Sequence, residues 1–324
     1  MSREPSARSP EGQAARPAAT GPSLVTGGRG FAGRHLVELV GDGARAPSSE
    51  ELDLRDGAAV RAAIRELEPA TVFHLAAFSS PSESWEHPDQ GLLTNLEMTL
   101  HLLEAVRREA PDATVVLVGS GQVYGEPETP PIGEDEPLAP GNPYAVGKAA
   151  SDMLGRQYAQ AYGMRVVRLR PFNHAGPGQR DEYVVSSLAR QVAEAEAAGL
   201  SDMTLRTGNP ESRRDFTDVR DVVRAYALAS GLDGGAFNVC SGRSTSVEEL
   251  VAMVAGHARI PVRHEVDPDR LRAHDARDMC GSHDRLTEAT GWTPEIPLDQ
   301  TIRDTLDWWR ARATASPGGA RRHA

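Results

Sequence analysis

Short apolar runs alternate with longer amphipathic segments through the first half of the chain. Residues 23–40, SLVTGGRGFAGRHLVELV, have the pattern of a strand, a glycine-rich turn and a helix with one apolar face. A helix followed by a strand recurs in residues 58–77 and again in residues 92–120, where the strands are TVFHLAA and TVVLVGS. This alternation predicts an α/β fold built on a Rossmann-type, doubly wound parallel sheet.

The pattern weakens at two places. Residues 41–52, GDGARAPSSEEL, should hold the second strand but contain little apolar material, so the path of the chain there stays open. Beyond residue 176 the alternation becomes irregular, which predicts a main domain over residues 23–176 and a smaller C-terminal lobe over residues 177–312. Within that lobe, VRAYALAS and GGAFNVCSG could return to the main sheet. The terminal segments 1–22 and 313–324 are polar or composed of small residues and are expected to be disordered tails.

Composition narrows the classes of function. The 324 residues carry a formal net charge of −11, which argues against non-specific binding of nucleic acid. No apolar window reaches the length of about 18 residues that a membrane span needs. Cys240 and Cys280 fit no metal-ligand spacing and are expected to be core residues of a protein in the reducing cytoplasm. We therefore expect a cytoplasmic protein with no metal site and no membrane partner.

The turn after the first strand has the composition of a dinucleotide-binding loop. Gly27, Gly30 and Gly33 stand between the strand and the helix, with Phe31 at the helix start. Glycines let the backbone turn tightly beside a pyrophosphate, whose charge the amides at the start of the helix stabilise. Residues 23–176 are therefore expected to form a dinucleotide-binding Rossmann domain.

The residues that would meet the rest of the cofactor come from three later segments. About 20 residues after the turn, a carboxylate would bind the adenosine ribose of NAD and an arginine would accept the 2′-phosphate of NADP. That region holds Arg45 and two serines, so NADP(H) is favoured over NAD(H), although the same side chains also suit a solvated loop. We expect Asp53 and Leu54 beside the adenine, and Ala76 and Ala77 beside the nicotinamide half.

A candidate set for carbonyl chemistry follows the fourth apolar run. Tyr144 and Lys148 are four residues apart at the start of a helix, so their side chains share a face. A lysine ammonium close to a phenol should lower the pKa of that phenol towards neutrality and make it a usable acid or base. Ser120, at the end of the run, could hydrogen-bond the same substrate oxygen. Tyr144 and Lys148 are also expected to contact the cofactor.

The motifs TGGRGFAG, HLAA, GSGQVYG, YAVGK and RRDFTDVRD, in this order, resemble those of the extended short-chain dehydrogenase/reductase superfamily. The resemblance covers roughly residues 23 to 310. It implies that Ser120, Tyr144 and Lys148 act on a carbonyl or hydroxyl of a nucleotide-linked hexose while a nicotinamide exchanges hydride. The longer strings RPFNHAGPGQ, TGNPESRRDFTDVRDVVRAY and DPDRLRAHD resemble the GDP-4-keto-6-deoxy-D-mannose reductases, which are relatives of the GDP-mannose 4,6-dehydratases.

This resemblance implies a binding site for a nucleotide sugar, mainly in the C-terminal lobe. Arginine forks suit a desolvated diphosphate, and Arg214 and Arg272 stand where the family places them. Trp85 could line the sugar or anchor a loop, and His174 could be catalytic or structural. The residues expected to bind the substrate are Ser79, Ser80, Gln122, Asn173, Gly208, Asn209, Arg214 and Arg272.

Gly121 and Gln122 separate the possible reactions. A 4,6-dehydratase needs a carboxylate base, and usually an acid, one or two residues after the Ser or Thr. Glutamine cannot accept a proton at neutral pH and glycine has no side chain, so elimination is disfavoured unless a base such as His174 replaces them. Ketone reduction needs only the Ser–Tyr–Lys set and a nicotinamide.

The sequence thus predicts an NAD(P)H-dependent 4-ketoreductase acting on a GDP- or dTDP-linked 4-keto-6-deoxyhexose in deoxysugar biosynthesis. A dehydratase or epimerase with tightly bound NAD(P) is the alternative enzyme, and a nicotinamide-sensing scaffold that lost its chemistry is a third possibility. The resemblance also implies a homodimer, formed through the helices at residues 92–110 and 144–162.

Overall fold

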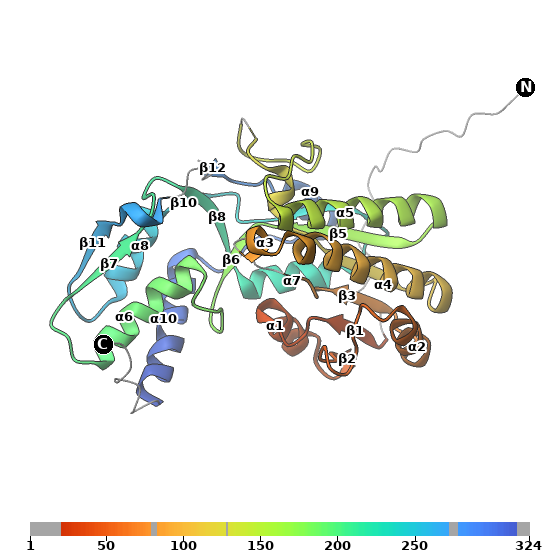
Figure 1. Ribbon diagram of the computed structural model, residues 1–324, viewed down its shortest axis with the longest axis horizontal. Coiled ribbons are helices and arrows are strands. Elements are labelled where there is room, and N and C mark those ends of the chain that lie inside the picture. The colour runs from red at the N-terminus through yellow and green to blue at the C-terminus, as the bar shows by residue number, and fades with distance from the viewer. Residues whose placement is uncertain (1–20, 79–82, 128, 272–277, 316–324) are drawn as a thin grey trace, which may run out of the picture.

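A six-stranded parallel sheet forms the centre of the protein (Figure 1). The computed structural model describes residues 21–78, 83–127, 129–271 and 278–315. The strand order is β2-β1-β3-β4-β5-β9, and every neighbouring pair is parallel, which confirms the Rossmann-type doubly wound fold. The strands are β1 (Ser23–Thr26), β2 (Ala44–Arg45), β3 (Thr71–His74), β4 (Thr114–Val118), β5 (Arg165–Pro171) and β9 (Gly235–Val239).

The second strand has only two residues. β2 pairs with β1 at Ser23 and Leu24, and the chain then leaves the sheet. Because residues 41–52 offer few apolar side chains to bury, little holds a longer strand against the sheet. At the other edge, β9 from the second half of the chain pairs with β5, so the GGAFNVCSG segment does return to the main sheet.

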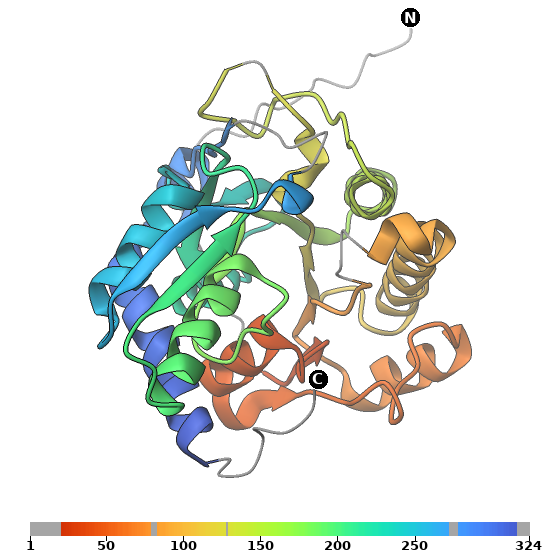
Figure 2. The ribbon, with the colours of Figure 1, turned by 60° about the vertical axis from the view of Figure 1, so that its left-hand side comes forward.

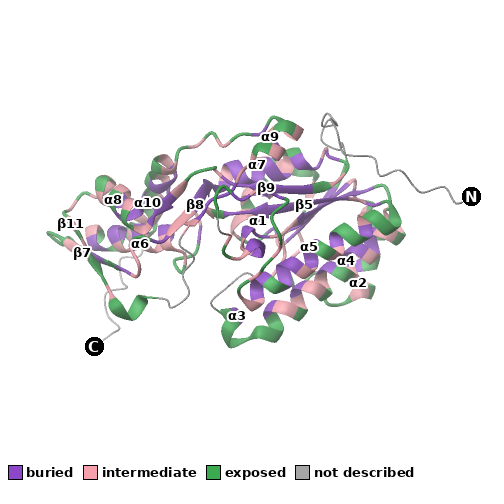
Figure 3. Ribbon diagram, turned by 90° about the horizontal axis from the view of Figure 1, so that it is seen from above, coloured by how far each residue is buried: buried purple, intermediate pink, exposed green. Residues whose placement is uncertain are grey.

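Helices cover both faces of this sheet because its strands are apolar on both sides. Val116 packs with α1 (Phe31–Val40) and α7 (Val219–Ala229), while its neighbour Val115 packs with the opposite layer. That layer consists of α2 (Gly57–Leu67), α4 (Asn95–Glu109) and α5 (Pro143–Tyr162). Side chains alternate between the faces along a strand, and Figure 3 shows the buried strands between helices whose outer surfaces are exposed.

Short helical turns connect these elements where the chain must change direction. They are η1 (Gly41–Gly43), α3 (Glu83–Glu86), the π-helical turn η2 (Gln90–Thr94) directly before α4, and η3 (Gly121–Tyr124) directly after β4. The last of these follows Ser120 and therefore lies at the carboxyl edge of the sheet.

A second hydrophobic core forms the smaller lobe. It is built from α6 (Val184–Ala197), α8 (Val247–His257) and α10 (Leu298–Ala315), which pack on β8 (Arg213–Asp218) and on the parallel pair β7 (Met203–Thr207) and β11 (Val262–Val266). β6 (Asn173–Ala175), β10 (Ser244–Ser246) and β12 (Asp278–Met279) pair with β8. The turn η4 (Pro268–Arg270) and helix α9 (Asp284–Thr290) complete the order. Figure 2 shows this lobe on one side of the sheet and the α4–α5 pair on the other.

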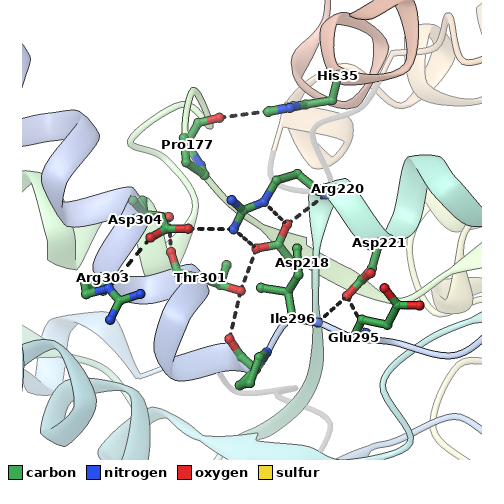
Figure 4. A network of polar contacts seen from close by, with 12 residues as sticks. His35, Pro177, Asp218, Arg220, Asp221, Glu295, Ile296, Thr301, Arg303 and Asp304 are labelled. Atoms are coloured by element: carbon green, nitrogen blue, oxygen red, sulfur yellow. Dashed lines mark hydrogen bonds and ion pairs between the residues drawn. The ribbon is translucent and has the colours of Figure 1, made fainter. Parts of the chain in front are cut away.

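Buried polar contacts join the lobe to the main sheet (Figure 4). Asp218, where β8 meets α7, accepts hydrogen bonds from the Arg220 guanidinium and from Thr301 Oγ1 on α10, at 2.7–2.8 Å. Arg220 also contacts Asp304 of α10 at 2.8 Å. His35 on α1 contacts the Pro177 carbonyl oxygen at 3.0 Å. These contacts hold the two lobes on either side of the carboxyl edge of the sheet.

No described helix has the length and apolar composition of a bilayer span. Within the same residues, no cluster of three or more His, Cys, Asp or Glu side chains could hold a metal ion. Cys240 and Cys280 are both buried, as expected. Residues 1–20 and 316–324, where disordered tails are expected, lie outside the described residues.

Candidate active site

The glycine turn lies at the point where the strand order of the sheet reverses. The chain leaves β1 for β2 on one side and returns to β3 on the other, and ligands of such sheets bind at this crevice. Gly27 has φ = +74°, and a Cβ there would lie 2.6 Å from the Ala76 backbone nitrogen. A Cβ on Gly33 would lie 2.1 Å from the Gly27 carbonyl oxygen. The turn is therefore closed to any side chain at these two positions.

The same turn fits a pyrophosphate. Helix α1 begins after Gly30, and no side chain caps its first amides. A helix start with free amides and a backbone exposed by glycine suits an anion. Phe31 and Ala76, both expected to contact the cofactor, flank this turn, and Ala77 follows Ala76.

The three residues expected near the adenosine of the cofactor, Arg45, Asp53 and Leu54, differ from one another in their surroundings. Arg45 ends β2 and is exposed, and its side chain makes no hydrogen bond or ion pair with the described residues. Asp53 is held by Arg55 through a 2.7 Å contact, and this contact lowers the pKa of Asp53 to about 2. The Leu54 side chain packs in the core, and its carbonyl oxygen contacts His101 Nδ1 at 3.0 Å.

Ser120, Tyr144 and Lys148 all lie near the end of β4. Asn142 caps α5 by accepting a hydrogen bond from the Ala145 amide at 2.8 Å, which places Tyr144 in the first turn of the helix and Lys148 one turn later. The Ser120 side chain lies close enough to the Tyr144 hydroxyl to lower the pKa of that phenol. Lys148 Nζ donates to the Val118 carbonyl oxygen at 2.9 Å. All three side chains belong to buried residues.

The charge state of Tyr144 differs from the expectation. We expected Lys148 to lower the pKa of the phenol, but burial raises it to about 12, and the nearby Ser120 hydroxyl offsets only part of this rise. Burial also lowers the pKa of Lys148 to about 8. Desolvation disfavours the charged form of each group. Tyr144 is therefore protonated at neutral pH, which is the form of a proton donor.

Gly121 and Gln122 occupy a tightly packed turn. A Cβ on Gly121 would lie 2.9 Å from the Phe172 ring, so this position cannot hold a catalytic side chain in the present packing. Asn142 Nδ2 donates to Gln122 Oε1 at 3.1 Å. Because the Gln122 carbonyl is held in this way, its NH₂ group is the part that can contact a ligand.

His174 packs against the cofactor turn. Its ring stacks on Phe31 at a centroid distance of 5.8 Å, and its Nδ1 contacts the Phe172 carbonyl oxygen at 3.2 Å. Burial lowers its pKa, so the ring is neutral. These contacts favour the structural interpretation of His174.

The expected substrate residues are spread over the lobe. Asn173 lies on β6 and is exposed. The Gly208 turn approaches η4, where a Cβ would lie 2.5 Å from the Arg270 carbonyl oxygen, and Asn209 Oδ1 accepts from the Glu211 amide at 3.0 Å. Arg214 lies on β8 and donates to Ser212 Oγ at 2.9 Å. Trp85 is exposed on α3. Ser79, Ser80 and Arg272 lie outside the described residues.

Tyr183 is a site residue that the sequence analysis missed. It stands at the N-cap position of α6 without a capping side-chain hydrogen bond, and it lies close enough to Tyr144 to raise the pKa of that phenol. In the sequence, Tyr183 follows the GPGQ turn by four residues. Periodicity alone does not connect this position to Tyr144.

His74 and Asn95 are polar residues that hold the segments next to the site through hydrogen bonds. His74 Nδ1 contacts Thr26 Oγ1 at 2.8 Å and its Nε2 contacts Thr99 Oγ1 at 3.3 Å, while burial lowers its pKa to about 3. Asn95 accepts from the Phe78 amide at 2.7 Å. These polar side chains in apolar segments were not singled out because their partners lie on other elements.

The chain is similar to known nucleotide-sugar enzymes. Residues 44–305 match the family model described as GDP-mannose 4,6 dehydratase. The chain is 38% identical over 297 residues to a GDP-6-deoxy-D-mannose reductase from Pseudomonas aeruginosa, covering 89% of this chain and 97% of that protein.

Two solved structures are similar across nearly the whole chain. The structure of RMD from Pseudomonas aeruginosa complexed with NADPH matches with a TM-score of 0.79 and 34% identity, covering 90% of this chain and 100% of that one. The UDP-glucose 4-epimerase of Thermus thermophilus in complex with NAD matches with a TM-score of 0.78 and 34% identity, covering 89% and 99%. The resemblance therefore extends to proteins with different reactions and different nicotinamide cofactors.

Proposed function

The chain belongs to the GDP-mannose 4,6-dehydratase family, within the extended short-chain dehydrogenases/reductases, and from this premise we propose that it is a nucleotide-sugar 4-ketoreductase. It is an NAD(P)-dependent oxidoreductase that reduces the C4 carbonyl of a nucleotide-linked 4-keto-6-deoxyhexose. The similarity to GDP-6-deoxy-D-mannose reductase supports this reaction.

One observation supports reduction over elimination. The turn after β4 keeps Ser120 beside a protonated Tyr144, whereas Phe172 excludes any side chain at Gly121. Reduction of a ketone consumes a proton, and the protonated Tyr144 can donate it. Elimination needs a base and an acid, and neither Gly121 nor Gln122 provides one.

The residues of the chain divide the work of the reaction. The hydride for C4 would come from a reduced nicotinamide held at the glycine turn. Tyr144 gives its proton to the C4 oxygen, so that the carbonyl becomes a hydroxyl. Ser120 orients that oxygen through a hydrogen bond. Lys148, charged below pH 8, stabilises the negative charge that Tyr144 acquires as its proton leaves.

The cofactor contacts are also proposals. Gly27, Gly30 and Gly33 would hold the pyrophosphate, and Arg45 would meet a 2′-phosphate, since no carboxylate ends β2. We therefore favour NADPH. The solved relative complexed with NADPH supports this choice, and the epimerase complexed with NAD shows that this fold accepts either cofactor.

The substrate would lie between the sheet and the smaller lobe. Arg214 and Arg272 are proposed to hold its diphosphate, and the amide of Gln122 is proposed to contact the sugar. Gly208 and Asn209 would approach the nucleoside, and Asn173, Ser79 and Ser80 the phosphate or sugar. A homodimer through α4 and α5 is a further proposal, because Leu93, Leu100 and Met153 are apolar and exposed on these helices and the turn before them.

The test is oxidation of the reduced cofactor in the presence of the keto sugar. Purified protein is incubated with NADPH and a GDP-linked 4-keto-6-deoxyhexose, or its dTDP analogue, and the absorbance of NADPH is followed. We expect consumption of one NADPH for each molecule of keto sugar reduced, and loss of about a hundredfold or more in rate for Tyr144→Phe. No oxidation with either substrate would reject the proposal. Turnover of GDP-mannose without net loss of cofactor would instead identify a dehydratase.

A further inference from the structure

The glycine turn and the segment after β2 are in direct contact. A Cβ on Gly28 would lie 2.6 Å from the Ala46 Cβ, so the turn rests on the residues that follow the second strand. In Rossmann folds the end of this strand lies beside the adenosine ribose, where a 2′-hydroxyl distinguishes NADH from the 2′-phosphate of NADPH. Charged groups that bridge the turn and this segment therefore bear on the choice of cofactor.

Such a bridge is present. Arg29, in the turn, contacts Glu51 Oε2 at 3.2 Å. The same carboxylate oxygen accepts a hydrogen bond from the Ser48 amide at 2.7 Å, and the Glu51 amide lies 3.2 Å from Ser48 Oγ. These contacts lower the pKa of Glu51, so the carboxylate is ionised. Although Glu51 lies six residues beyond the end of β2, the turn at Ser48 returns it to the cofactor loop.

The negative charge of Glu51 counteracts the attraction of Arg29 and Arg45 for a phosphate. Arg45 makes no ion pair among the described residues, whereas the guanidinium of Arg29 is already paired with Glu51. A 2′-phosphate would attract both arginines and would be repelled by Glu51. Because both partners of the Arg29–Glu51 pair are largely exposed, the pair is weak and Arg29 can exchange one anion for another.

We propose that Glu51 weakens the preference of this chain for NADPH by competing with the 2′-phosphate of NADPH for Arg29. The proposal rests on the function proposed above, because it concerns the cofactor of the same site. NADH lacks the phosphate and leaves the Arg29–Glu51 pair intact. Glu51 thus weakens the binding of NADPH without improving that of NADH, and it reduces the discrimination that Arg45 and Arg29 would otherwise give.

The variant Glu51→Gln isolates this effect. Gln keeps the length of the side chain and its Oε1 can still accept from the Ser48 amide, so the turn is retained while the charge is removed. Glu50→Gln is the matched control, because Glu50 is the exposed neighbour and makes no hydrogen bond or ion pair with the described residues. Arg29→Gln removes the other member of the pair.

The experiment measures the dissociation constants of NADPH and NADH with the full chain, by titration calorimetry and without sugar substrate. We expect Glu51→Gln to bind NADPH about three- to tenfold more tightly and to change NADH binding less than about twofold. Arg29→Gln should weaken NADPH by a similar factor, the double variant should lose the gain, and Glu50→Gln should match the wild type.

Two results would overturn the proposal. An unchanged NADPH affinity in Glu51→Gln would show that the carboxylate does not compete for Arg29. A loss of NADH affinity would show that Glu51 binds the ribose hydroxyl instead. Failure of the proposed function is a separate outcome, because a chain that shows the predicted shift in binding but reduces no keto sugar would support the role of Glu51 and reject the reductase.

Discussion

At the scale of single residues, burial decides what the Ser–Tyr–Lys set can do. Tyr144 and Lys148 lie in the same low-dielectric space, and there each loses part of its tendency to ionise. The outcome is a protonated phenol beside an ammonium that is charged at neutral pH. This pair is suited to give a proton to a substrate oxygen and not to take one from a hydroxyl.

The pH dependence of reduction should follow Lys148. Its pKa of about 8 lies below its ordinary value, so the ammonium is present below pH 8 and is lost as the pH rises through 8. We expect kcat/KM for ketone reduction to fall about tenfold per pH unit above this value, because the neutral amine no longer stabilises the developing phenolate. Steady-state rates from about pH 6 to about pH 10 measure this.

Lys148→Arg provides the control for that profile. Arginine stays charged over the same range, so its lower activity should remain flat with pH. A wild-type profile that is also flat to about pH 10 would show that Lys148 does not set the rate.

The packing of Gly121 predicts the outcome of changing Gln122. In Gln122→Glu, Asn142 Nδ2 can donate to the new carboxylate as it does to the amide, so the turn should persist. We expect ketone reduction within about tenfold of the wild type and no formation of 4-keto sugar from GDP-mannose, because position 121 still lacks an acid. Chromatography of the nucleotide sugars measures both reactions, with Gln122→Ala as the control. Dehydration by Gln122→Glu alone would contradict this interpretation.

At the scale of elements, β8, α7 and α10 meet through a buried carboxylate. Asp218 receives hydrogen bonds from the Arg220 guanidinium, from the Arg220 amide at the start of α7 and from Thr301 on α10. The helix that closes the smaller lobe is thereby tied to a helix of the main sheet. These contacts fix the distance between the main sheet and the smaller lobe, between which the substrate is proposed to lie.

Asp218→Asn should destabilise this junction. The amide would direct its NH₂ group at groups that are themselves donors, and Arg220 would lose its buried partner. We expect the free energy of unfolding to fall by about 2–4 kcal/mol in chemical denaturation. Asp299→Asn on α10 is the control, because the exposed Asp299 carboxylate contacts only His257 among the described residues. This variant should change the free energy of unfolding by less than about 0.5 kcal/mol. Equal effects of the two variants would contradict the role of Asp218.

At the scale of the whole molecule, one apolar surface is not covered by any other part of the described chain. α4 and α5 lie on the side of the sheet away from the smaller lobe (Figure 2). Leu93, just before α4, is 61% exposed, and Met153 on α5 is 62% exposed, with Leu100 and Val146 also exposed on the same two helices. A second copy docked here would leave the carboxyl edge of the sheet open.

Met153→Arg should therefore weaken the dimer proposed above. A charge in the centre of an apolar interface is costly when desolvated, and we expect the dissociation constant of the dimer to rise about tenfold or more. Light scattering after size-exclusion chromatography measures the mass as a function of concentration. Leu200→Arg, at an exposed apolar position in the smaller lobe, is the control. Identical masses for the wild type and Met153→Arg would count against this face as the interface.

The sequence by itself determined the parts of the protein that depend on local order. The alternation of apolar strand and amphipathic helix predicted the parallel sheet, because each strand must be apolar to be buried between two helical layers. The glycines at 27 and 33 predicted the cofactor turn, and the spacing of Tyr144 and Lys148 predicted a shared helix face. Each of these rests on residues that are close together along the chain.

Only the tertiary structure decided the properties that arise between distant segments. The protonated state of Tyr144 depends on how deeply helix α5 is buried, and the closure of position 121 depends on Phe172, which lies on a later strand connection. Likewise, Glu51 reaches Arg29 only because the chain turns at Ser48. Desolvation and steric contact act through space, so no pattern of neighbours along the sequence could reveal them.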